Sequence, residues 1–166
     1  MTDRLDRMWA TWRSDYVADA ARPERRQEGC VLCAVIAEGD NQTVRSGTHA
    51  SVILNRYPYN NGHLMVIPHA HVSDLSDLAP DVRSEVFELL NEAVDAVKLA
   101  YEPDGVNFGA NLGRGAGAGI PDHLHVHALP RWHGDTNFMT TVAGTRIMPE
   151  SLEETGAKLR AAFGNR

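Results

Sequence analysis

The stretch His123-Leu124-His125-Val126-His127 places three imidazoles at alternate positions of a short apolar run. Successive side chains of a β-strand point to opposite faces, so residues i, i+2 and i+4 share one side. The pattern therefore predicts a strand with one face of histidines, while Leu124, Val126 and Ala128 face the core. A row of neutral imidazoles can supply a nucleophile, a proton shuttle or a set of metal ligands.

A glycine-rich loop directly precedes the histidines, with four glycines in the seven residues 113–119. Because glycine has no Cβ, the backbone N–H groups of such a loop can approach phosphate oxygens closely. A neutral imidazole is a good nucleophile near pH 7, and its attack on phosphorus forms a covalent phosphoramidate. The combination predicts His125, the central histidine, as a nucleophile toward phosphorus, with the flanking imidazoles orienting it or protonating the departing phosphate.

Composition limits the classes of function. The chain has 166 residues, 43% of them hydrophobic, and a net charge of −6, which is typical of one globular domain. The negative charge disfavours general binding to nucleic acid or to an anionic membrane. The charged start of the chain predicts no secretory signal, and we expect a cytoplasmic protein.

The rest of the chain predicts an α+β domain with a largely antiparallel sheet. A stripe that includes Trp9 and Trp12 indicates an amphipathic helix near the N-terminus, and the regular apolar spacing after Pro80 indicates the longest helix. The expected helices are residues 3–20, 30–37, 81–101 and 150–163, and the expected strands lie within 39–47, 51–55, 63–68, 106–111, 123–130 and 137–142. Two further histidines, His49 and His133, are expected to be solvated residues of loops.

Two cysteines, Cys30 and Cys33, are separated by two residues. In a cytoplasmic protein this spacing favours a metal or redox site over a structural disulfide. A tetrahedral zinc site needs two more ligands, for which the candidates are His69 or His71 and one histidine of the triad. Alternatively, the two residues are buried free cysteines that behave as small hydrophobic residues. A redox pair is another alternative, although no βαβ context supports it.

The sequence resembles the histidine triad (HIT) superfamily, and within it the bacterial diadenosine tetraphosphate (AP4A) phosphorylase-like branch. The resemblance lies in five motifs, which are residues 123–130, 55–68, 107–111, 117–123 and 130–138. It implies an HIT-like fold in which a long helix and a C-terminal helix pack on a five-stranded, largely antiparallel sheet. It also implies a single domain of residues 1–166, divided into an N-terminal helix and loop (1–29), an HIT core (30–138) and a C-terminal extension (139–166).

The resemblance implies a nucleotidyltransferase or hydrolase of dinucleoside polyphosphates. His125 would attack the α-phosphorus and hold the nucleotidyl group covalently, and His127 and His63 would complete the polar network. The nucleotide and phosphate contacts would come from Asn55, Asn111, Arg114, Gly117, Gly119 and His123. Water as the acceptor would give hydrolysis, and inorganic phosphate would give phosphorolysis with release of ADP.

The resemblance also implies a homodimer, no organic cofactor and a structural zinc ion on Cys30, Cys33, His71 and His123. One departure concerns Gly119-Ile120, which stands where much of the family has Gln and then Ser or Thr. An amide and a hydroxyl are therefore missing where they would touch the leaving group, which affects substrate preference. Backbone N–H groups of the glycine loop are the expected substitute.

Two other functions compete with this one. The first is a metal-dependent hydrolase in which His123 and His125 bind a catalytic metal beside Asp122, with His127 as a candidate third ligand. It predicts a metal at His125 and loss of activity on chelation. The second is a nucleotide-binding regulator with little turnover, whose affinity for nucleotide would survive replacement of His125.

Overall fold

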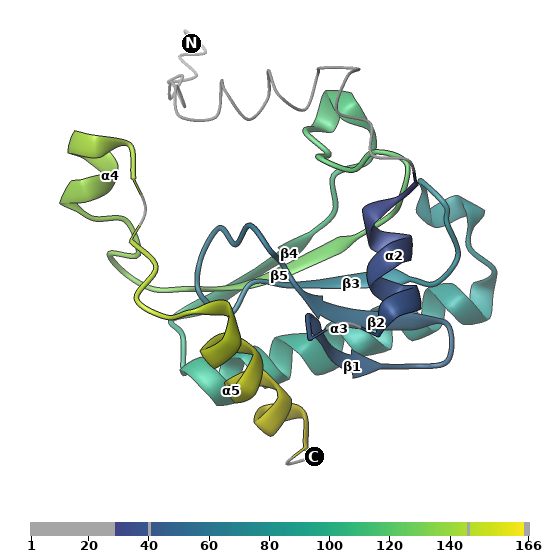
Figure 1. The fold of residues 1–166 in the computed structure, drawn as a ribbon, viewed down its shortest axis with the longest axis horizontal. Helices are drawn as coiled ribbons and strands as arrows, with labels where there is room; N and C mark the ends of the chain where they lie inside the picture. The colour runs from purple at the N-terminus through teal and green to yellow at the C-terminus, as the bar shows by residue number, and fades with distance from the viewer. Residues whose placement is uncertain (1–28, 40, 146, 165–166) are drawn as a thin grey trace, which may run out of the picture.

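The computed structural model describes residues 29–39, 41–145 and 147–164. Its centre is a five-stranded antiparallel sheet with the order β1-β2-β3-β5-β4 (Figure 1). The strands are β1 (Thr43–Ser46), β2 (Ala50–Leu54), β3 (Leu64–Pro68), β4 (Gly105–Gly109) and β5 (Val126–Arg131). The predicted fold class and the predicted edge strand within residues 39–47 are therefore confirmed. The predicted helix at residues 3–20 lies outside the described residues.

Helix α3 (Pro80–Tyr101) covers one face of the sheet. Pro80 occupies its first turn, where a missing N–H costs nothing, and the buried residues recur every three or four positions. These are Val86, Leu89, Leu90, Ala93, Ala96 and Val97, and they pack against Val52, Leu54, Leu64, Val66, Leu124, Val126 and Ala128. The core prediction for the histidine segment is therefore confirmed.

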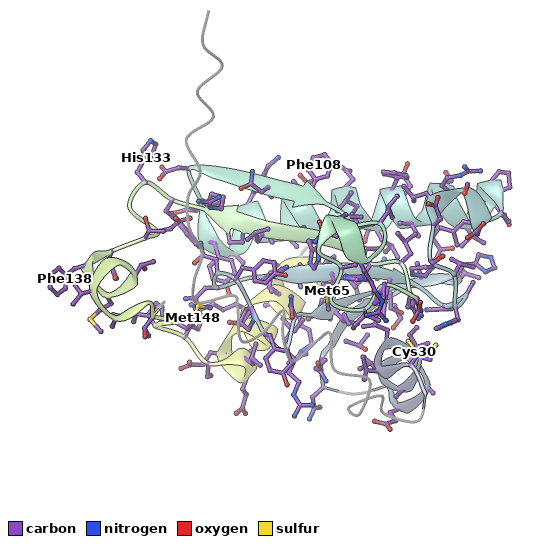
Figure 2. The ribbon with its side chains drawn as sticks, turned by 90° about the horizontal axis from the view of Figure 1, so that it is seen from above. Cys30, Met65, Phe108, His133, Phe138 and Met148 are labelled. Carbon is purple, nitrogen blue, oxygen red and sulfur yellow. The ribbon has the colours of Figure 1, made fainter. Side chains whose placement is uncertain are left out.

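Helix α2 (Val31–Glu38) lies on the opposite face. Its Leu32 joins Ile53, Met65 and Ile67 in a second, smaller apolar cluster. Figure 2 shows this layering, with Cys30 and α2 on one side of the sheet and α3 on the other. Because alternate residues of a strand face opposite ways, the histidines lie on the α2 face.

The C-terminal part of the chain contains two helices. The predicted strand at residues 137–142 is wrong, because Phe138–Ala143 forms helix α4. The side chain of Asn137 accepts a hydrogen bond from Met139 N at its start, and Gly144 ends it in the left-handed conformation. Helix α5 (Leu152–Gly164) confirms the closing helix and packs on α3 and β1. Helix α4 lies apart from the sheet (Figure 1).

The described residues contain no helix that combines the length and the apolar character required to cross a bilayer.

Candidate active site and metal centre

The three histidines adopt the predicted alternation, but only His127 lies within a strand. Strand β5 begins at Val126, so His123 and His125 belong to the segment that leads into it. The reason is that Leu124 N donates to Val72 O, in the loop after β3, rather than to a neighbouring strand. The rings of His125 and His127 still meet edge to face, with their centroids 5.0 Å apart.

His63 and His127 form a hydrogen-bonded pair, with 3.0 Å between His63 Nε2 and His127 Nδ1. Tyr59 N donates to His63 Nδ1 at 3.0 Å. A neutral imidazole has one donor and one acceptor nitrogen, so the proton of His63 is on Nε2 and is donated to His127. The proton of His127 is then on Nε2, where it is available to an oxygen of a bound ligand.

The position of the proton on His125 follows from the same reasoning. His125 Nδ1 lies 2.8 Å from the backbone oxygen of His123, and a carbonyl oxygen can only accept. Nδ1 of His125 therefore carries the proton, and the lone pair of the neutral ring is on Nε2. This is the nitrogen that can attack an electrophile.

Burial keeps two of these imidazoles uncharged. It is the main cause that lowers the pKa of His63 to about 3, with smaller effects from the charges of His127 and His125. Burial, followed by the charge of His125, lowers the pKa of His127 to about 4. Both rings are therefore neutral at pH 7, as the hydrogen bonds between them require.

These pKa values predict how stability depends on pH. The unfolded chain protonates both histidines near pH 6.5, whereas the folded chain does so only near pH 4 and pH 3. Stability is therefore lost as the pH falls below about 6.5, by about 1.4 kcal/mol per pH unit for each of the two sites. The free energy of unfolding, measured with urea at pH 7.5, 6 and 5, should fall less steeply with decreasing pH in His127→Asn than in the wild type. The difference in slope should correspond to about one fewer proton taken up on unfolding. An unchanged dependence would contradict this assignment.

A second group of side chains gathers on the α2 side of His123. The donor atoms of Cys30, Cys33, His71 and His123 all lie within 4.8 Å of one another. Nδ1 of His123 is 3.3 Å from the sulfur of Cys30 and 3.5 Å from that of Cys33, and Nδ1 of His71 is 3.3 Å from Cys33. The four residues predicted as zinc ligands are thus brought together, although they come from α2, from the loop after β3 and from the segment before β5.

The four residues fit a zinc ion. Tetrahedral ligands at about 2.0–2.3 Å from zinc are separated by about 3.3–3.8 Å, which matches the sulfur–nitrogen distances here. His123 Nε2 lies 3.0 Å from the backbone oxygen of Pro68, so it carries the proton and leaves the lone pair of Nδ1 toward the cysteines. Such a hydrogen bond is what fixes the ring of a metal-binding histidine. His69, the alternative to His71 as a ligand, instead contacts Ser51, with 2.9 Å between His69 Nε2 and Ser51 Oγ.

A groove of about 980 Å³ opens between α2 and the sheet, on the face that carries the histidines. Its walls are mainly apolar, with Leu32, Val35, Ile53, Met65 and Ile120 among them. Asn55 also lines it, and Nδ2 of this residue lies 3.3 Å from His63 Nδ1. Met65, which lines the groove, is the register partner of His127, so the groove ends next to the histidines, none of which lines it. A volume of this size suits a nucleoside-sized ligand.

The glycine-rich loop leaves β4 and returns beside the same histidines. Gly109, at the end of β4, is paired with His127, and the chain returns at His123. Gly113 and Gly117 have φ values of 77° and 88°, which non-glycine residues rarely adopt, and a Cβ added at either would meet open space. The loop contains the predicted contacts Asn111, Arg114, Gly117 and Gly119, of which Arg114 and the two glycines are exposed. The described residues show no hydrogen bond from this loop to the histidines.

Sequence reasoning missed two parts of the site. Tyr59 covers the histidine pair, with its ring centroid 4.7 Å from that of His63 and 5.8 Å from that of His127. The groove under α2 was also not predicted. The turn signal of residues 56–62 pointed to this region, but it gave no information on where the ring of Tyr59 would lie. His49 and His133 are exposed, as predicted.

The antiparallel sheet, the row of three histidines and the preceding glycine loop are the features of one class of protein, and the chain belongs to the HIT domain family. The sequence model of the HIT domain matches residues 37–134.

Among individual proteins, the chain is 36% identical over 161 residues to an AP-4-A phosphorylase of Mycobacterium tuberculosis, covering 92% of this chain and 82% of that one. A solved structure of a zinc-bound histidine triad family protein from Mycobacterium smegmatis has a TM-score of 0.67 and 32% identity, and covers 82% of this chain and 94% of the other. A hypothetical histidine triad nucleotide-binding protein from Sulfolobus tokodaii has a TM-score of 0.69 and 28% identity, with 82% and 93% coverage.

Proposed function

We propose that the protein transfers nucleotidyl groups from dinucleoside polyphosphates through a covalent intermediate on His125. The observation that carries this proposal is the bond from Nδ1 of His125 to the backbone oxygen of His123, which leaves the lone pair on Nε2. Two relatives add support through their names, one an AP-4-A phosphorylase and the other a nucleotide-binding protein. An oxidoreductase or a simple binding module would not need an oriented nucleophile beside a donor such as His127 Nε2–H.

The reaction consists of two displacements at the α-phosphorus. Nε2 of His125 forms a bond to phosphorus while the bond to the bridging oxygen breaks, so that the remaining nucleotide leaves with the electron pair. His127 Nε2–H stabilises the charge that develops on the phosphate oxygens, and His63 holds the ring of His127 in place. Water or inorganic phosphate then attacks the same phosphorus, and the bond to nitrogen breaks to regenerate the neutral imidazole.

The remaining parts of the site would bind the substrate. The apolar walls of the groove suit the flat faces of a base, and Asn55 lies between the groove and the histidines, where a ribose would be. Asn111, Arg114, Gly117 and Gly119 would contact the phosphate chain through the backbone N–H groups and the guanidinium of the loop. This role of the backbone also compensates for the missing amide and hydroxyl at Gly119-Ile120.

We further propose that Cys30, Cys33, His71 and His123 hold a structural zinc ion. The donor set and its spacing fit zinc, and a relative of 32% identity has been solved with zinc bound. The ion would tie α2 to the segment that carries His125, and so fix one wall of the groove. The homodimer remains a prediction from the family.

The alternative of a catalytic metal on the histidine row has less support. Among the described residues, the one group of three or more metal-binding side chains includes His123 but neither His125 nor His127. His127 Nδ1 accepts a hydrogen bond from His63, so Nε2 of this ring carries the proton and offers no lone pair to a metal. Of His125 and His127, only His125 is left with a free lone pair. Their arrangement therefore suits proton and phosphate chemistry better than metal binding.

Product analysis with diadenosine tetraphosphate tests the proposed reaction and identifies the acceptor. If the protein is a phosphorylase, we expect ADP and ATP only when inorganic phosphate is present. AMP with ATP in the absence of phosphate would indicate a hydrolase that uses the same attack at the α-phosphorus. ADP alone in the absence of phosphate would indicate a hydrolase that attacks the β-phosphorus, which would contradict the proposed step. No turnover of this substrate or of its triphosphate and pentaphosphate analogues, under either condition, would contradict the proposal.

A further inference from the structure

The turn that carries His63 rests on the ring of Tyr101. Gly62 is buried and has a φ of 73°, so a residue with a side chain would be strained there. A Cβ added to Gly62 would lie 2.7 Å from Tyr101 Cε2 and 3.2 Å from Pro130 Cγ. The backbone next to His63 is thus in close contact with the last residue of α3, and the position of the Tyr101 ring limits where His63 can lie.

Tyr101 is held in turn by the C-terminal part of the chain. Its hydroxyl donates to Glu150 Oε1 at 2.8 Å, and Thr155 Oγ1 donates to the same oxygen at 2.8 Å. The other carboxylate oxygen of Glu150 accepts from Lys158 Nζ at 2.6 Å, and this ammonium group also lies 5.6 Å from the centre of the Tyr101 ring. The carboxylate of Glu150 therefore connects α5 with the end of α3.

The charges of this network are well defined. Burial, and then the contact with Glu150, raises the pKa of Tyr101, so its hydroxyl stays protonated and donates. Burial opposes the charge of Glu150, but hydrogen bonds from Lys158, Tyr101 and Thr155 outweigh it and lower the pKa of this carboxyl group. Glu150 is therefore a carboxylate with three donors at neutral pH, and its side chain is only 11% exposed.

The C-terminal part of the chain also reaches the His63 turn itself. A small cavity of about 130 Å³ lies between them and is lined on one side by Asn61, Gly62 and His63. Glu150 and Thr155 are on the other side. The segment that lies across this cavity from His63 therefore belongs to the part of the chain after residue 134, where the match to the HIT domain ends.

We propose that Glu150 and Tyr101 are positioning residues for His63, which they hold so that its Nε2–H donates to His127. The inference rests on the proposed function, in which His127 in turn donates to the phosphate. Neither residue touches the reacting atoms. Their effect passes from the carboxylate to the phenol, from the phenol ring to Gly62, and from Gly62 to the ring of His63.

The test compares Glu150→Gln and Tyr101→Phe with Glu153→Gln. Glu153 is an exposed glutamate in the first turn of α5, three residues after Glu150, and serves as the matched control. A displacement of a supporting group by a fraction of an ångström is expected to lower kcat about tenfold. KM should change less than twofold, because the groove is untouched. If the two residues act as one unit, the double variant should be no slower than the slower single variant.

A second measurement does not depend on turnover. In ¹⁵N spectra of the histidine rings, the wild type and Glu153→Gln should give the same signals, with His63 as the Nε2–H form. Both test variants should instead shift the signals of His63 Nε2 and His127 Nδ1, because the hydrogen bond between these two atoms is loosened. Unchanged His63 signals and an unchanged kcat in Glu150→Gln would overturn the inference. Thermal unfolding shows whether each variant folds. If Glu150→Gln does not fold, Tyr101→Phe, which keeps the aromatic ring, provides the test. A wild-type chain without turnover would refute the proposed function, while the ring spectra would still test the positioning.

Discussion

Replacement of His125 with glycine is expected to lower the rate of nucleotidyl transfer on the order of 10⁴-fold or more, because the variant has no nitrogen to attack phosphorus. The decisive measurement is the intermediate itself. Brief mixing of the wild type with a dinucleoside polyphosphate labelled at the α-phosphorus should leave label on the protein. The label should be stable to base and labile to acid, as a phosphoramidate is. His125→Gly should carry none.

A matched control comes from His133, which is exposed and whose ring nitrogen Nδ1 lies 3.0 Å from Asp104 Oδ2, away from the site. His133→Gly makes the same chemical change and should retain the label and the full rate. Equal labelling of wild type and His125→Gly would exclude the covalent mechanism. Tight nucleotide binding by both proteins, without turnover by either, would instead support the nucleotide-binding regulator.

The second large effect concerns the proposed zinc site. Elemental analysis should find one zinc per chain in the wild type and none in Cys30→Ser/Cys33→Ser. Structural zinc contributes directly to folding free energy. If the loss amounts to about 3 kcal/mol, the melting temperature of a chain of this size falls by about 6–12 °C. A chelator should cause the same fall in the wild type and none in the double variant.

The neighbouring histidines provide the control for the metal centre. His71 belongs to the group of four possible ligands. His69, two residues before it in the sequence, instead forms a hydrogen bond with Ser51. His71→Asn should therefore lose the zinc and His69→Asn should keep it. A wild type that is free of metal and melts at the same temperature as the double variant would contradict the zinc proposal.

The sequence predicted best those elements that depend on interactions between residues close together in the chain. The helix at 80–101 and the alternation at 123–127 follow from periods that are set by backbone geometry, and both are present. The segment 137–142 is predicted as a strand, and this prediction is wrong. The cap formed by Asn137, which is equally local, instead makes it a helix.

Contacts between distant parts of the chain were harder to predict. The grouping of Cys30 and Cys33 with His71 and His123 came from the family resemblance, since spacing alone left His69 open. The groove under α2 and the ring of Tyr59 over the histidine pair depend on tertiary packing, which no periodicity encodes. The same holds for Glu150, which is nearly ninety residues from His63 in the sequence and meets its turn only in the folded chain.

His123 belongs to both centres through different atoms. Its ring faces the cysteines, while its main-chain oxygen accepts a hydrogen bond from Nδ1–H of His125. No substitution at this position can delete that oxygen. Replacement of the ring would therefore remove a proposed zinc ligand and leave in place the acceptor that orients His125. A protein changed at residue 123 would thus report how far loss of the proposed zinc ion alone disturbs the proposed chemistry at His125, two residues away.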